Sequence, residues 1–76
     1  MSEQRTIDLR GLQCPGPLVK LNEEISTFAV GDEFVAIADD RAFELDVHAW
    51  CELTGNDLVS VDASSSDSIV ASIRKT

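Results

Sequence analysis

A run of apolar residues near the middle of the 76-residue chain places the strongest constraint on its fold. In Glu33-Phe34-Val35-Ala36-Ile37-Ala38 every position after the glutamate is apolar, and a strand that faced water on one side would alternate polar and apolar residues instead. The run therefore predicts a central strand that is covered on both faces. The remaining segments must supply its neighbours.

Two helical segments flank this strand. Between residues 15 and 28, apolar residues recur at the spacing of one helical face, while residues 44–54 carry a second helical segment whose apolar positions span more than one face. Asp39-Asp40 is a candidate cap for the second helix, and Gly55-Asn56 is a typical stop signal. Two helices are therefore expected.

Three further segments have the character of strands. Residues 6–9 alternate polar and apolar residues, and Gly11 follows where the backbone can take a positive φ. Residues 58–61 and 69–73 are rich in strand-forming residues and are joined by a serine-rich loop, as in a hairpin. The order β-α-β-α-β-β predicts an α/β two-layer sandwich in which two helices cover one face of a four-stranded mixed sheet. We expect residues 1–76 to form a single domain, because a second core would need more apolar sequence.

The acidic composition bears on partners and location. Fourteen acidic and 6 basic residues give a net charge of −8, which opposes binding to the phosphate backbone of nucleic acids. A solvated acidic surface is the simplest interpretation, and a basic partner or a high-salt cytoplasm are alternatives. Because the sequence has no run typical of a signal peptide or a membrane span, we expect a cytoplasmic protein.

Two cysteines and one histidine are too widely spaced for a zinc site. Cys51 follows Trp50 in an apolar helical segment, which is typical of a packed core residue. The alternative is a resolving thiol that forms a disulfide with Cys14. We interpret His48 as a surface or capping residue and Asp39-Asp40 as turn and capping groups, and we expect neither a metal nor a bound cofactor.

Cys14 stands immediately before the first helical segment, in Cys14-Pro15-Gly16-Pro17. Pro15 suits the first helical position, because its φ is fixed and it has no N–H. Unpaired N–H groups and the helix dipole stabilise a thiolate at such a helix start. Since Pro17 removes another N–H, the backbone N–H groups of Gly16 and Leu18 are the candidate donors to the sulfur. Taken alone, Cys-Pro is weak evidence for reactivity and favours a structural cysteine that caps the helix or is buried.

Arg10 lies close to Cys14 in the connection between strand and helix. Its guanidinium could stabilise a thiolate or persulfide electrostatically. The alternative is a salt bridge with Asp8 or another acid, and the sequence leaves both open.

The segment Asp8-Leu9-Arg10-Gly11-Leu12-Gln13-Cys14-Pro15-Gly16-Pro17 resembles the N-terminal signature of the TusA/SirA-like family. Gly31-Asp32, Ala38-Asp39-Asp40 and Asp46-Val47-His48-Ala49-Trp50-Cys51 follow in the order expected for that family, so the resemblance covers nearly the whole chain. It implies the fold of the C-terminal domain of the third translation initiation factor. One departure is Gly16, where the member that supports transfer RNA thiolation has a glutamate.

The resemblance implies a sulfur carrier that accepts sulfur as a persulfide on Cys14. A cysteine desulfurase or rhodanese-like protein would be the donor, and a protein with a reactive cysteine would be the acceptor, in transfer RNA thiolation, cofactor or sulfur metabolism. Such a monomeric carrier is a co-substrate more than an enzyme. The alternative is a regulatory or redox-sensing interaction module of the same fold, in which Cys14 serves structure or redox sensing.

Overall fold

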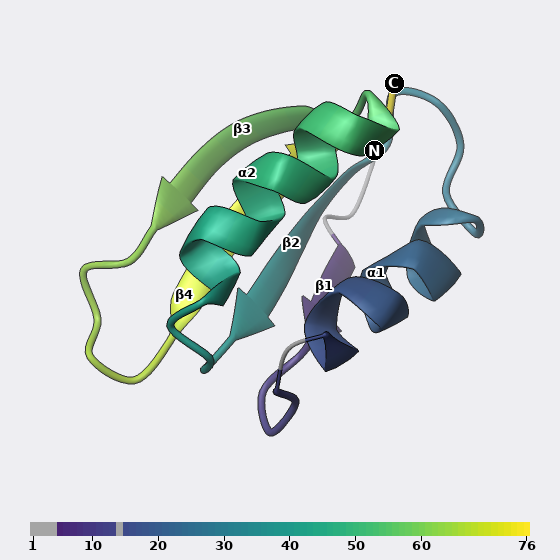
Figure 1. Ribbon diagram of the computed structural model, residues 1–76. Coiled ribbons are helices and arrows are strands. Elements are labelled where there is room, and N and C mark those ends of the chain that lie inside the picture. Colours follow the sequence, from purple (N-terminus) through teal and green to yellow (C-terminus); the bar gives the residue numbers. More distant parts are fainter. Residues whose placement is uncertain (1–4, 14) are drawn as a thin grey trace.

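A computed structural model describes residues 5–13 and 15–76 of the chain. The elements follow one another in the order β1 (Arg5–Asp8), α1 (Gly16–Ile25), β2 (Glu33–Ala38), α2 (Phe43–Thr54), β3 (Asp57–Asp62) and β4 (Ile69–Arg74) (Figure 1). This order confirms the predicted β-α-β-α-β-β arrangement. Neither helix in this part of the chain combines the length and the apolar character needed to cross a membrane.

The four strands form one mixed sheet with the strand order β1-β2-β4-β3. β1 runs parallel to β2, whereas β4 is antiparallel to both β2 and β3. β2 and β4 pair along their whole length, from Glu33 opposite Arg74 to Ala38 opposite Ile69. β2 is therefore a central strand, as the apolar run predicts, and β3 and β4 form the predicted hairpin.

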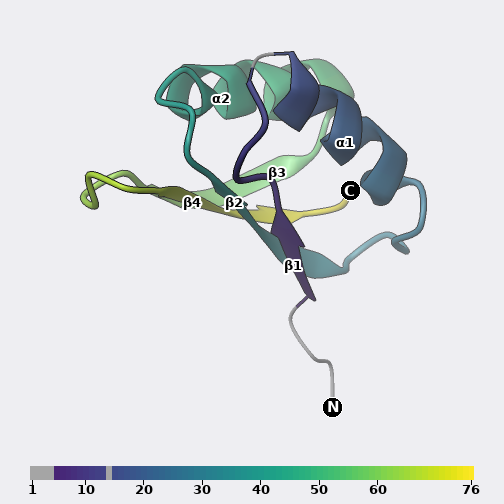
Figure 2. The same ribbon diagram turned by 90° about the horizontal axis from the view of Figure 1, so that it is seen from below.

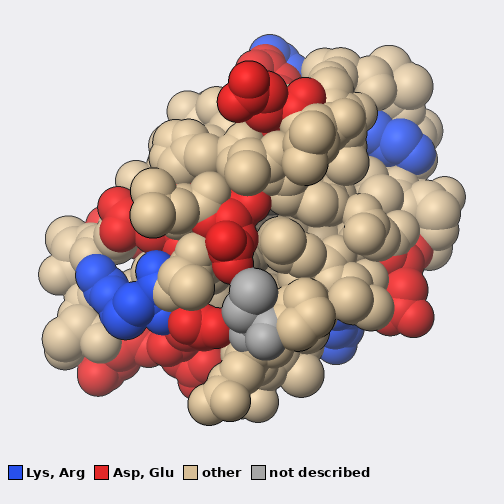
Figure 3. All heavy atoms as spheres, viewed as in Figure 1, with Lys and Arg blue, Asp and Glu red and all other residues tan. Residues whose placement is uncertain are grey.

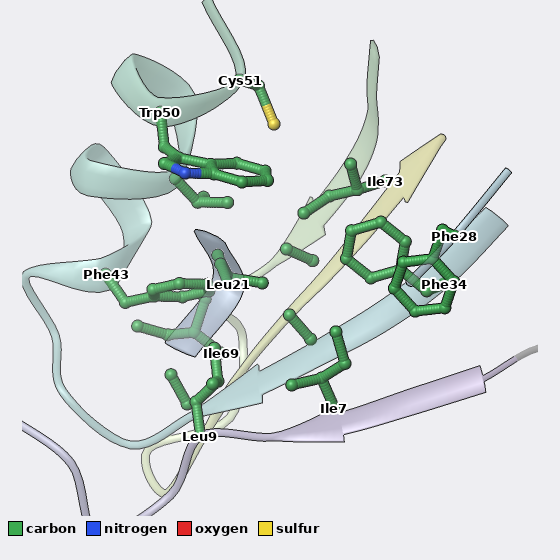
Figure 4. Packing of buried hydrophobic residues seen from close by; sticks show 14 residues of the cluster. Ile7, Leu9, Leu21, Phe28, Phe34, Phe43, Trp50, Cys51, Ile69 and Ile73 are labelled. Carbon is green, nitrogen blue, oxygen red and sulfur yellow. The ribbon is translucent and has the colours of Figure 1, made fainter. Parts of the chain in front are cut away.

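Both helices pack on the same face of the sheet, as Figure 2 shows. The predicted two-layer α/β sandwich is confirmed. The core lies between the layers (Figure 4), and its buried members are Ile7, Leu9, Leu21, Phe28, Phe34, Ala36, Ala38, Phe43, Val47, Trp50, Cys51, Ile69, Ala71 and Ile73. An N–H from the Trp50 indole (Nε1) donates to Oδ1 of Asn22 at 2.8 Å and so joins the two helices.

The second face of β2 is less covered than its sequence predicts. Phe34 is fully buried on the helical side, while Val35 and Ile37 are only half-buried on the other side. The prediction of a strand covered on both faces was wrong, because no helix of the described chain lies over that second face. Side chains of the neighbouring strands cover it in part, since Val70 on β4 lies directly opposite Ile37.

α1 is shorter than predicted and ends at Ile25, not at Phe28. The hydroxyl groups of Ser26 and Thr27 donate to backbone carbonyls three residues earlier, which competes with continuation of the helix. The ammonium of Lys75 donates to the carbonyls of Ile25 and Phe28, at 3.0 and 2.6 Å, and thereby satisfies acceptors at the helix end. Phe28 still reaches the core from the following turn.

α2 ends before Gly55, as the stop signal predicts, and it begins at Phe43, one residue before the predicted Glu44. The Asp40 carboxylate accepts a hydrogen bond from the Ala42 N–H at 3.0 Å, and its carbonyl accepts one from the Phe43 N–H at 2.9 Å. Gly55 follows the last turn with a φ of 77°, a left-handed conformation that favours glycine. The interpretation of Asp40 as a turn group is confirmed, but its interpretation as the helix cap was wrong, because Ala42 holds the capping position and no side chain there makes a capping bond.

Candidate functional site

The candidate site is the connection from β1 to α1, which carries the predicted motif. Cys14, its predicted reactive residue, lies outside the described residues. The surroundings that the structure describes are the chain before Cys14, the first turn of α1 and the end of β2. These segments meet because parallel strands place their C-terminal ends at the same edge of a sheet, as β1 and β2 do in Figure 1.

Hydrogen bonds fix the first half of this connection. The Leu9 N–H donates to the carbonyl of Ile37 at 2.7 Å, which continues the pairing of β1 with β2, and the Leu12 N–H donates back to the Leu9 carbonyl at 3.3 Å. The Gly11 N–H donates to both carboxylate oxygens of Asp39, at 3.1 and 3.0 Å. Gly11 has a φ of 86°, so the predicted positive φ is confirmed.

Arg10 forms a two-pronged ion pair with Asp8. Its Nε lies 2.9 Å from Oδ1 and its Nη2 lies 3.0 Å from Oδ2, while the Arg10 backbone N–H also donates to Oδ1. These side-chain and backbone hydrogen bonds lower the pKa of the Asp8 carboxyl to about 2, and the same ion pair raises the pKa of Arg10. The salt-bridge alternative is therefore confirmed, and a role of Arg10 toward the sulfur of Cys14 stays a prediction.

The low pKa of Asp8 leads to a testable pH dependence. Asp8 should titrate with a midpoint near pH 2 in the folded protein and at a clearly higher pH in Arg10→Ala, which loses the side-chain bonds but keeps the backbone N–H of residue 10. Because the folded-state pKa is depressed, the stabilisation from the pair is complete above the ordinary pKa and is lost as the pH falls toward 2. Carboxyl-carbon NMR measures both midpoints.

A matched control for this titration is Arg74→Ala, which removes the separate ion pair between Arg74 and Asp57. It should leave the Asp8 midpoint unchanged. A midpoint near pH 4 for Asp8 in the unmodified protein would contradict the ion pair.

α1 begins at Gly16, with Pro15 in the capping position and Pro17 in its first turn. Pro15 was predicted as the first helical residue, so the boundary differs by one position. No described side chain caps this helix end, and its first turn contains no acidic residue to offset the positive end of the helix dipole. The helix start thus retains the electrostatic character that favours a nearby anion.

The two candidate backbone donors have different surroundings. The Gly16 N–H donates to the Gln13 carbonyl at 2.7 Å, so any bond to the sulfur of Cys14 would share this hydrogen. Leu18 is half-buried against the core. Donation from Gly16 or Leu18 to the sulfur stays a prediction, as does the role of Cys14 itself.

Gly16 also packs closely on Leu12. A Cβ at position 16 would lie 3.3 Å from the Cβ of Leu12, which is tighter than ordinary van der Waals contact. A side chain there would require Leu12 to move.

A depression of about 400 Å³ adjoins this connection. It is lined by Gln13, Asp39, Asp40 and Arg41, and Gln13 is the residue before Cys14 in the chain. The Arg41 guanidinium donates to the Ser65 carbonyl at 3.2 Å, which joins this edge to the loop between β3 and β4. The surroundings of the motif are thus polar and carry charges of both signs.

Acidic side chains also occupy several separate areas on the helical side of the molecule, with fewer basic ones among them (Figure 3). In the described part of the chain, no three His, Cys, Asp or Glu side chains are placed to hold a metal ion. His48 is exposed on α2, in agreement with its interpretation as a surface residue.

Cys51 lies in the core between α2 and the sheet (Figure 4), and only 3% of its surface is exposed. Burial raises the pKa of its thiol to about 11, with a smaller contribution from the charge of Asp57. The prediction of a packed core cysteine is confirmed. A thiol with this pKa is almost wholly protonated at neutral pH and is a poor nucleophile.

Cys51 should therefore resist alkylation in the folded protein. In the variant Cys14→Ser, where Cys51 is the remaining thiol, we expect negligible reaction with N-ethylmaleimide at pH 7 within a time that modifies free cysteine completely. The same variant should react fully in concentrated urea, which serves as the control. Reaction of the folded variant at the rate of free cysteine would show that Cys51 is accessible.

Comparison with known proteins adds two similarities. A family model described as "Sulfurtransferase TusA" matches residues 5–75. Over 62 residues, or 82% of the chain, the sequence is 37% identical to an Aquifex aeolicus (strain VF5) protein named "Putative sulfur carrier protein". The chain spans about a third of the length of that relative, with 32% of it covered.

Proposed function

Because the chain belongs to the TusA sulfurtransferase family, we propose that it carries sulfur as a persulfide on Cys14 and passes it to an acceptor protein. The observation that carries this proposal is the family match, which extends across the motif. The place of Cys14 agrees with it, because this cysteine directly precedes Pro15 and a helix whose first turn has no acidic residue. The 37% identity to a relative named as a sulfur carrier supports the same role.

The local chemistry favours Cys14 over Cys51 as the carrier. A thiolate next to a helix start is stabilised by the dipole and by backbone N–H groups, and the thiolate is the nucleophilic form. Cys51 is buried and its pKa is raised to about 11. Of the two thiols, Cys14 is therefore the one we assign to sulfur transfer.

The proposed transfer consists of two exchanges that conserve the oxidation state. The Cys14 thiolate attacks the outer sulfur of a donor persulfide, the S–S bond of the donor breaks, and the donor leaves as a thiolate. Cys14 then holds the outer sulfur as a persulfide. A thiolate of the acceptor attacks that outer sulfur, and Cys14 leaves as the thiolate that started the cycle.

The partners follow from this chemistry. The donor is a protein that forms a persulfide, such as a cysteine desulfurase or a rhodanese-like protein, and the acceptor has a reactive cysteine. Transfer RNA thiolation, cofactor synthesis and sulfur metabolism are pathways that such a carrier would serve in the cytoplasm. We propose that residues 1–76 act as one monomeric domain, because both exchanges require Cys14 to meet successive partners.

Single-turnover loading and delivery test the proposal. After incubation with a cysteine desulfurase and cysteine, or with polysulfide, the protein should gain one sulfur atom by intact-protein mass spectrometry, and dithiothreitol should remove it. Cyanide should release the same sulfur as thiocyanate, and Cys51→Ser should behave like the unmodified protein. No gain from either donor, together with a Cys14 that resists alkylation in the folded state, would favour an interaction module instead.

A further inference from the structure

We propose that Asp39 is a positioning residue for sulfur transfer, because its carboxylate holds the chain that leads to Cys14. This inference rests on the proposed function of Cys14. Asp39 follows directly after β2, whereas the backbone that it binds follows β1, 28 positions earlier in the sequence. The contact therefore joins the motif connection to the neighbouring strand.

Asp39 makes a contact that depends on its side chain. The Leu9 N–H bonds to a backbone carbonyl of β2, the Arg10 N–H bonds to the carboxylate of Asp8 at the end of β1, and the Leu12 N–H bonds to the Leu9 carbonyl. The Gly11 N–H instead bonds to the carboxylate of Asp39. This bond requires an oxygen at a fixed distance from the backbone at position 39, so it depends on the sequence.

Gly11, which donates the hydrogen bond to Asp39, also has a backbone conformation that favours glycine. Its φ of 86° lies in the left-handed region, although a Cβ at this position would meet no atom within 4 Å. Glycine is therefore favoured by the backbone conformation and not by lack of space. The conformation of Gly11 and the carboxylate of Asp39 together fix the direction in which the chain leaves β1.

Only Leu12 and Gln13 separate the anchored Gly11 from Cys14. On the far side, the Gly16 N–H is bonded to Gln13, and α1 is held by the buried Leu21. Loss of the Asp39 contact would release the connection on its β1 side. Exchange between two proteins requires the reacting sulfur atoms to meet in one geometry, and displacements of about 1 Å reduce such rates strongly.

The variants Asp39→Ala and Asp39→Asn separate positioning from charge. Asparagine keeps a side-chain oxygen that can accept the Gly11 N–H but removes the negative charge, whereas alanine removes both. Asp32→Ala is the matched control, because Asp32 precedes β2 at its opposite end and its carboxylate accepts the Ala29 N–H at 2.9 Å. It also removes one charge and one contact to the backbone.

The second-order rate constant for sulfur transfer from a loaded desulfurase to each folded variant is the measured quantity. We expect a loss of about tenfold or more in Asp39→Ala, and rates within about twofold of the unmodified protein in Asp39→Asn and Asp32→Ala. A rate in Asp39→Ala equal to that of the unmodified protein would overturn the inference. Equal losses in Asp39→Asn and Asp39→Ala would also overturn it, since charge would then be the cause.

Two further outcomes remain decisive. If the unmodified protein takes up no sulfur, the proposed function fails, and the inference that rests on it fails with it. If Asp39→Ala does not fold, hydrogen exchange of the Gly11 amide tests the bond between Gly11 and residue 39. Exchange about tenfold or more slower than in an unstructured peptide, in both the unmodified protein and Asp39→Asn, supports that bond. Exchange of that amide at the rate of an unstructured peptide would overturn it.

Discussion

Replacing Cys14 with serine is expected to abolish sulfur transfer, with a rate loss of about a thousandfold or more. A serine hydroxyl is of similar size, but it stays protonated at neutral pH and offers no sulfur on which a persulfide can form. The buried Cys51 cannot take over, because its thiol is 3% exposed and its pKa is raised to about 11. The loss should therefore be complete and not partial.

Transfer of labelled sulfur from a loaded desulfurase, through the carrier, to an acceptor thiol measures this effect. Cys51→Ser is the matched control and should keep a rate near that of the unmodified protein. Urea unfolding followed by the fluorescence of Trp50, the single tryptophan, verifies that each variant is folded. A Cys14→Ser variant that keeps more than a tenth of the rate would exclude Cys14 as the carrier.

The largest effect on stability is expected for Phe34→Ala. Phe34 is fully buried on β2 and stacks on Phe28, with ring centroids 4.7 Å apart and an angle of 7° between the ring planes. The Arg5 guanidinium lies over the Phe28 ring, 4.5 Å from its centroid. Removal of the Phe34 ring would leave a cavity next to the central strand and cost about 3–5 kcal/mol.

That loss is large for so short a chain. At about 0.05–0.15 kcal/mol per residue, a chain of this length has a free energy of unfolding of about 4–11 kcal/mol. Phe34→Ala should therefore shift the urea midpoint strongly or leave the protein unfolded. Leu53→Ala is the control, because Leu53 is 87% exposed on α2 and should change stability by less than about 0.5 kcal/mol. Similar midpoints for the two variants would contradict the packing around Phe34.

Most of the fold could be predicted from the sequence, because its elements have strong local signals. Hydrophobic periodicity and the glycine positions were sufficient to predict the order of the elements, the two layers and the end of α2 before Gly55. The partial exposure of the second face of β2 could not be predicted, since an apolar run does not show how many layers cover it. The early end of α1 depends on contacts from Lys75, far along the chain.

The candidate site was predicted less completely than the fold. The motif identified Cys14 and the helix start, and the choice between two roles for Arg10 required the observed geometry with Asp8. The bond between Asp39 and Gly11 was missed, although both residues follow neighbouring strands. Parallel pairing of β1 and β2 would have brought them to one edge, but a hydrogen bond between them depends on distances that sequence patterns do not contain.

Locating the transferred sulfur is the most direct test of the proposed carrier function. The protein would be loaded by a cysteine desulfurase, its thiols and persulfides would be alkylated, and its peptides would be analysed by mass spectrometry. We predict one additional sulfur atom on the peptide that contains Cys14 and none on the peptide that contains Cys51. Additional sulfur on Cys51, or on neither peptide after complete reaction with the donor, would contradict the proposal.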